Sequence, residues 1–233
     1  MPICFDDIIS LGSDCEVALQ LRRLGLLHTP SVFDWLITPW DAMLRVIQDE
    51  GTHLCNNIYS GYNGTGAVCS GYELVYWHEF PRDEAGQVMV TQAAANTAQK
   101  KLRHKIERMQ AVLKSGKTVL FVRGGMATDA PRDKYGLGLS FPTSRLNDFP
   151  ALISRLFPEL KFSLLFLEYV GRDRLEGDCV LDPRIMHYRM ECPKNSNQPI
   201  CPKPDPAAWE LLFSRVNYDH KPNEHASDNE TLF

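Results

Sequence analysis

The strongest constraint on the fold of this chain is a set of short, mainly apolar runs that alternate with stretches of helical periodicity. Residues 117–123 read Lys-Thr-Val-Leu-Phe-Val-Arg, residues 161–167 form a second such run, and residues 5–11 form an Ile-rich run that ends at Gly12. Strands that are apolar throughout are typical of parallel sheets buried on both faces. We therefore expect an α/β fold with a mainly parallel sheet.

Helical patterns separate the apolar runs and fix the order of the elements. A further strand is expected at residues 72–77, a Gly-rich mobile loop at residues 61–71, and short edge strands at residues 179–181 and 185–190. Helices are expected at residues 15–24, 39–48, 91–115, 146–157 and 206–215. This alternation implies helices on both faces of the sheet, which is a three-layer sandwich, and it leaves room for one antiparallel edge strand.

Composition and charge narrow the class of protein. Of the 233 residues, 44% are hydrophobic and 23% are charged, which is typical of a folded globular protein. We expect a single α/β domain over residues 1–222 and a polar, disordered tail over residues 223–233. The net charge of −4 and the lack of a basic stripe argue against a nucleic-acid partner.

The N-terminus and the cysteines predict a cytoplasmic protein that does not enter a membrane. The first residues carry no basic region and turn acidic at once, and no apolar stretch reaches the roughly 18 residues that a spanning helix needs. Seven cysteines without a leader sequence are best interpreted as reduced thiols. Cys192 and Cys201 lack metal-ligand spacing, so we expect no metal site.

Cys15 occupies the most demanding position in the chain, between the first strand and the first helix. Ligands of open parallel sheets bind beyond the carboxyl ends of the strands, where the chain turns into a helix. A helix N-terminus lowers the pKa of a thiol there, and backbone N–H groups near Gly12, Ser13 and Asp14 could receive an oxyanion. The alternative is that Cys15 is a small, buried packing residue.

His78 is the best candidate for a base that would activate Cys15. It follows the strand expected at residues 72–77, so we expect it at the carboxyl ends of the strands, the same rim of the sheet as Cys15. Either Asp34 or Glu79 could orient its ring. The result would be a Cys-His-acid triad. The alternative is an ordinary histidine at the end of a strand.

Trp35 and Arg123 are candidates for substrate binding. The segment Ser31-Val32-Phe33-Asp34-Trp35 mixes large aromatic side chains with one carboxylate, as either a pocket wall or a corner of the core would. Arg123 ends a strand expected to be buried, so it would either reach an anionic substrate from the rim or pair with an acid inside the protein.

Several of these residues carry a resemblance to a known family. The blocks Leu11-Gly12-Ser13-Asp14-Cys15 and Phe33-Asp34-Trp35, followed by residues 78–81 and 119–123, resemble a bacterial family of unknown function that is described as papain-like cysteine peptidases. The resemblance implies a Cys15 nucleophile with His78 as its base. It also implies a papain-type fold, with the cysteine helix against an antiparallel barrel. The pattern of strands instead favours a flavodoxin-like or SGNH-hydrolase-like layout.

Three functions follow from these observations. The first is a hydrolase that works by acyl transfer through Cys15 and His78 on a small-molecule, peptide or glycan substrate, with no cofactor. The second is an acyltransferase that uses coenzyme A and acts on a polysaccharide precursor. The third is a noncatalytic module that binds a glycan or nucleotide through Trp35, Trp77 and Arg123. The sequence alone gives neither the substrate nor the oligomeric state.

Overall fold

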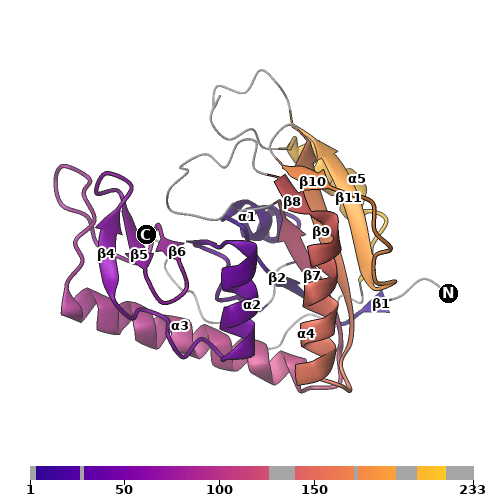
Figure 1. Ribbon diagram of the computed structural model, residues 1–233, viewed down its shortest axis with the longest axis horizontal. Coiled ribbons are helices and arrows are strands. Elements are labelled where there is room, and N and C mark those ends of the chain that lie inside the picture. The colour runs from indigo at the N-terminus through magenta and orange to yellow at the C-terminus, as the bar shows by residue number, and fades with distance from the viewer. Residues whose placement is uncertain (1–3, 27–28, 126–139, 171–172, 193–203, 219–233) are drawn as a thin grey trace.

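The computed structural model describes residues 4–26, 29–125, 140–170, 173–192 and 204–218. Its centre is a four-stranded sheet in the order β11-β9-β7-β2, in which every neighbouring pair is parallel (Figure 1). The strands are β2 (Asp7–Ser10), β7 (Thr118–Gly124), β9 (Lys161–Val170) and β11 (Ile185–Glu191). The predicted parallel sheet is confirmed.

The two edge strands expected late in the chain have different outcomes. Residues 185–190 fall within β11, which pairs with β9 in the parallel sense and forms one edge of the sheet. Residues 179–181 form no strand. The option of an antiparallel edge strand on this sheet is therefore not realised.

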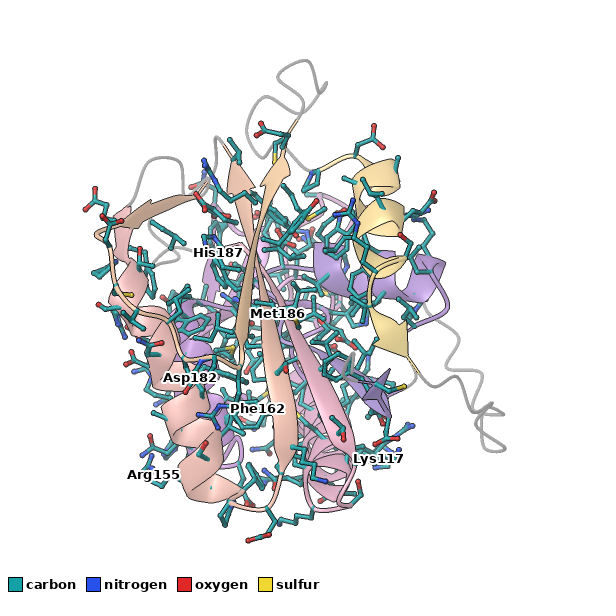
Figure 2. All side chains as sticks on the ribbon, turned by 90° about the vertical axis from the view of Figure 1, so that its right-hand side faces the viewer. Lys117, Arg155, Phe162, Asp182, Met186 and His187 are labelled. Carbon is teal, nitrogen blue, oxygen red and sulfur yellow. The ribbon has the colours of Figure 1, made fainter. Side chains whose placement is uncertain are left out.

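Both faces of the central sheet are covered, because successive residues of each strand point to opposite sides. Ile9, Phe121 and Phe166 pack with α2 (Trp40–Gln48), α3 (Gln92–Leu113) and α4 (Asp148–Leu156). Ile8, Leu120 and Leu165 pack with α1 (Glu16–Arg23) and α5 (Pro206–Phe213). Figure 2, which looks from the β11 side, shows α4 and α5 on opposite sides of the sheet. This is the expected three-layer arrangement.

The helices begin and end where the sequence indicates. Thr91 caps α3 by accepting from the Ala94 N–H, and Asp205 caps α5 by accepting from the Ala207 N–H. Gly25 and Gly116 follow α1 and α3 with positive φ angles of 69° and 75°, a conformation that glycine adopts without steric cost. No helix in the described ranges is both long and apolar enough to cross a bilayer.

A second, antiparallel sheet lies beside the central one and was not predicted. Its order is β3-β6-β5-β4, formed by β3 (Leu36–Ile37), β4 (Ile58–Gly61), β5 (Gly66–Cys69) and β6 (Leu74–Tyr76). The loop interpretation of residues 61–71 is wrong, because β5 within it is fully buried. Tyr62, Asn63 and Gly64 all have positive φ, and the tight turn that they form joins β4 to β5. Strands connected this closely must run antiparallel.

Two pairs of short strands and a 3₁₀ helix complete the described chain. β1 (Cys4–Phe5) pairs in parallel with β12 (Asn217–Tyr218), and β8 (Ser140–Pro142) pairs in parallel with β10 (Arg174–Glu176). A short 3₁₀ helix, η1 (Thr143–Asn147), leads into α4. The expected tail over residues 223–233 and Cys201 lie outside the described residues.

Candidate active site

The turn between β2 and α1 positions Cys15. Gly12 has a φ of 72°, and a Cβ atom there would lie 3.2 Å from the Phe33 carbonyl oxygen, so a glycine is required. Cys15 is the N-cap residue of α1 and is half-buried. The Glu16 N–H donates to Asp14 Oδ1 at 2.9 Å, which stabilises the first turn of the helix. The predicted strand, turn and helix around Cys15 are confirmed.

Arg123 lies beneath this turn instead of at the surface. It is 0% exposed, and its guanidinium donates to the carbonyl oxygens of Leu11 at 2.7 Å, Thr38 at 2.6 Å and Gly125 at 3.3 Å. These contacts are to backbone carbonyls, so the geometry favours a structural role over direct contact with substrate. Arg123 joins the turn after β2 to the end of β7 and to the segment that leads into α2.

Backbone bonds strengthen the same junction. The Gly124 N–H donates to the Gly12 carbonyl at 2.8 Å, and the Thr38 N–H donates to the Ser13 carbonyl at 2.8 Å. The Ser13 hydroxyl donates to the Gly124 carbonyl. Gly124 has no room for a side chain, because a Cβ atom would collide with the Tyr169 hydroxyl and would lie 2.5 Å from a Val17 methyl. The position of Cys15 is thus fixed by contacts from three separate segments.

Asp34 is a fully buried carboxyl group next to the turn. Its Oδ2 accepts from the Ser31 N–H at 2.9 Å. Burial raises the pKa of Asp34 to about 7, although the charge of Lys105, the bond from Ser31, the Ser10 hydroxyl and the charge of Arg22 all act to lower it. A group with this pKa changes its charge near neutral pH.

Replacing Asp34 with asparagine tests this raised pKa. In the wild type, the unfolded chain loses the Asp34 proton above pH 3.8 whereas the folded protein keeps it up to about pH 7, so folding stability falls as the pH rises through this window. From pH 5 to pH 7 this group should lower the free energy of unfolding by about 2 to 3 kcal/mol. The fall should be absent in Asp34→Asn and present in the exposed control Asp178→Asn, as measured by urea denaturation. Identical pH profiles for wild type and Asp34→Asn would contradict the assignment.

His78 is exposed and follows β6, so it comes from the antiparallel sheet and not from the parallel rim as predicted. Its ring packs edge-on against Trp35, with ring centroids 6.0 Å apart. Partial burial lowers the pKa of His78, and the charge of Arg82 lowers it further. The neutral imidazole that a general base requires is therefore favoured at neutral pH. Among the described residues no hydrogen bond joins His78 to Cys15, Asp34 or Glu79, so the triad stays a prediction.

Glu79 contacts lysines of α3. Its side chain is 3% exposed, with Oε2 3.0 Å from Lys101 Nζ and Oε1 4.0 Å from Lys105 Nζ. Lys105 is itself buried, and its charge also acts on Asp34. Lys105 therefore lies near both of the candidate acids. The sequence did not indicate Lys105 as a site residue, because the mixed charges of its helix predict side chains that are exposed to solvent.

The structure contains a histidine–carboxylate pair that the sequence did not suggest. His187 lies on β11 (Figure 2), and its Nε2 is 2.9 Å from Oε2 of Glu168 on the neighbouring strand β9. Because β2 and β11 are opposite edges of the sheet, with β7 and β9 between them, this pair does not adjoin the Cys15 turn. Among the described residues, no group of three or more His, Cys, Asp or Glu side chains could hold a metal ion.

Comparisons with known proteins give one match. No curated protein and no solved structure matches this chain. The model of a family described as "putative papain-like cysteine peptidase" matches residues 6–145, which is more than half of the chain and includes Cys15, Asp34, His78 and Arg123. The chain belongs to this family of putative papain-like cysteine peptidases.

Proposed function

We propose that this protein is a thiol-dependent hydrolase that works by acyl transfer from Cys15. The observation that carries the proposal is the placement of Cys15, which is half-buried at the first turn of α1, beyond the end of β2, and tied there through Arg123. A fixed thiol at a helix N-terminus on the ligand-binding rim of a parallel sheet is suited to nucleophilic attack. Membership of the family supports the same role.

The proposed reaction has two steps. In the first, His78 accepts the Cys15 proton and the sulfur bonds to the substrate carbonyl carbon; the leaving group then departs with that proton, giving a thioester. In the second, water donates a proton to His78 and its oxygen attacks the thioester carbon; the C–S bond breaks, the carboxylic acid leaves, and His78 returns the proton to the Cys15 sulfur. Backbone N–H groups around Gly12, Ser13 and Asp14 would stabilise the oxyanion in both steps. The Gly12 N–H already donates to Ser10 Oγ at 3.3 Å, so it would have to exchange this bond.

Trp35 and the two acids have supporting roles in this proposal. Trp35 packs against the His78 ring and limits its orientations. Asp34 precedes Trp35 in the chain, and Glu79 follows His78 and is paired with Lys101 and Lys105. Both acids would therefore act by holding the segments that carry Trp35 and His78.

The rate of iodoacetamide labelling as a function of pH tests the proposal, with each cysteine quantified by mass spectrometry. We expect Cys15 to react with an apparent pKa well below the ordinary thiol value of about 8.5. His78→Ala should raise this apparent pKa and slow labelling at pH 6.5 by about tenfold, since a paired imidazole stabilises the thiolate. The control His104→Ala changes an exposed histidine of α3 and should leave the rate unchanged.

Two results would count against the hydrolase. One is a Cys15 that reacts no faster than the exposed Cys4 at every pH, which would favour a packed thiol and a noncatalytic binding module. The other is a Cys15 profile that is the same in wild type and His78→Ala, which would remove His78 from the mechanism. The coenzyme A alternative predicts instead that acetyl-coenzyme A acetylates Cys15, which the same mass spectrometry detects.

A further inference from the structure

Arg22 is an exposed arginine held on the ring of Trp35. Its guanidinium carbon lies 5.3 Å from the ring centroid. In the part of the chain that the structure describes, no carboxylate lies within ion-pair distance of Arg22, whereas its neighbour Arg23 pairs with Glu210 at 2.5 Å. Stacking on an indole orients a guanidinium and leaves the N–H groups at its edge able to donate to an anion.

Arg22 lies on the same side of α1 as Cys15. The two residues are seven positions apart, which is about two helical turns, so they differ by only about 20° around the axis and by about 10 Å along it. Trp35 contacts Arg22 and also the ring of His78. The described contacts therefore connect Arg22 through Trp35 to the proposed base, and α1 connects it to the proposed nucleophile.

Two cations and one carboxylate act on His78, which Trp35 links to Arg22. Burial is the main cause of the lowered pKa of His78; the charges of Arg82 and Lys101 lower it further, and the charge of Glu79 acts in the opposite sense. The nearby carboxyl groups offset this charge only in part. Glu79 forms ion pairs with Lys101 and Lys105, and Asp34 is fully buried with a pKa of about 7. An anionic ligand at Arg22 would meet a favourable field.

We infer that Arg22 and Trp35 form a substrate subsite for an oxyanionic group, a carboxylate or a phosphate, two helical turns along α1 from Cys15. The inference rests on the proposed function and adds a substrate class to it: acyl compounds that carry an acidic group about six to eight bonds from the reacting carbonyl. The indole would pack against the part of the substrate that joins the two groups.

Thiol probes of matched length test the subsite. Each probe is a haloacetamide whose linker of about six carbons, enough to span the distance, ends in a carboxylate, a phosphate, a primary amide or a quaternary ammonium group. In the wild type, at least one acidic probe should reach half-maximal labelling of Cys15 at about a tenfold lower concentration than the amide probe, and the quaternary ammonium probe should need a higher one. The better acidic probe identifies the oxyanion.

Variants of two neighbouring arginines separate a subsite from a general effect of charge. In Arg22→Gln, the ratio between the amide and acidic probes should fall to about one. In Arg23→Gln, which removes the same charge one residue away, the ratio should persist. Arg22→Lys should restore only part of the ratio, because an ammonium group neither stacks as a plane nor donates as a fork.

The possible failures are distinguishable. If plain iodoacetamide labels Cys15 readily but acidic and amide probes perform equally in the wild type, the subsite is refuted and the hydrolase proposal is untouched. An acidic preference that survives in Arg22→Gln also refutes the assignment to Arg22. If Cys15 fails to react even with plain iodoacetamide, the proposed function fails and the subsite fails with it.

Discussion

Arg123→Met should lower the free energy of unfolding by about 3 to 5 kcal/mol, because it removes a buried charged donor from backbone carbonyls that have no access to water. The guanidinium bonds to Leu11 and Thr38, both buried, and lies 6.0 Å from the centroid of the Trp40 ring. Methionine fills much of the volume but donates no hydrogen bond. Chemical denaturation monitored by tryptophan fluorescence measures the change.

Arg82→Met is a matched control for this change. Arg82 also donates to three backbone carbonyls, those of Thr65, Trp77 and Gly86, but it is exposed. Water can replace its bonds, so the loss should be below about 1 kcal/mol. Equal losses for Arg82→Met and Arg123→Met would show that burial of Arg123 does not stabilise the turn that carries Cys15.

Lys105→Met should cost about 3 kcal/mol at pH 8, because it removes a buried cation that serves two carboxyl groups. The Lys105 side chain is 5% exposed and lies 4.0 Å from Glu79, and its charge also lowers the pKa of Asp34. At pH 5 Asp34 retains its proton, so the cost should be smaller there. Urea denaturation at both pH values measures the difference.

Lys101→Met removes the other lysine from the same carboxylate and is the control. Lys101 is closer to Glu79, at 3.0 Å, but its side chain is 39% exposed. Exposed ion pairs contribute little, so this variant should lose less than about 1 kcal/mol. The longer ion pair is thus expected to matter more than the shorter one, and the reverse order would contradict the importance given to burial.

The central sheet could be predicted because strands that are buried on both faces appear in the sequence as short apolar runs. The run of residues 119–122 is apolar throughout since helices cover both of its faces, and the patterns on either side of it are long enough to indicate helices. The antiparallel sheet offered no such signal. β5 is four residues long and begins with a glycine, and the positive φ angles at Tyr62 and Asn63 cannot be deduced from residue type alone.

The same distinction applies to the candidate site. The position of Cys15 follows from local sequence, namely a strand, Gly12 and the start of a helix. The role of Arg123 does not, because it depends on the pairing of β7 with β2, which places Val122 beside Ser10. The ion pair between Lys105 and Glu79 likewise depends on how α3 packs against the segment that follows β6. His78 was assigned to the parallel rim because β6 was counted among the parallel strands, although its residues match a strand in either kind of sheet.

The segment of residues 31–38 contributes a strand to the antiparallel sheet and also contacts the turn after β2. Its β3 strand pairs with β6, which precedes His78, while Thr38 bonds to Ser13 and to Arg123 beside Cys15. The distance between the Cys15 sulfur and the His78 imidazole therefore depends on residues 31–38, a segment that contains neither of them. A substitution in residues 31–38 would alter this distance while leaving the local surroundings of Cys15 and of His78 intact. Such a variant would lose activity although each residue, tested by itself, kept its reactivity.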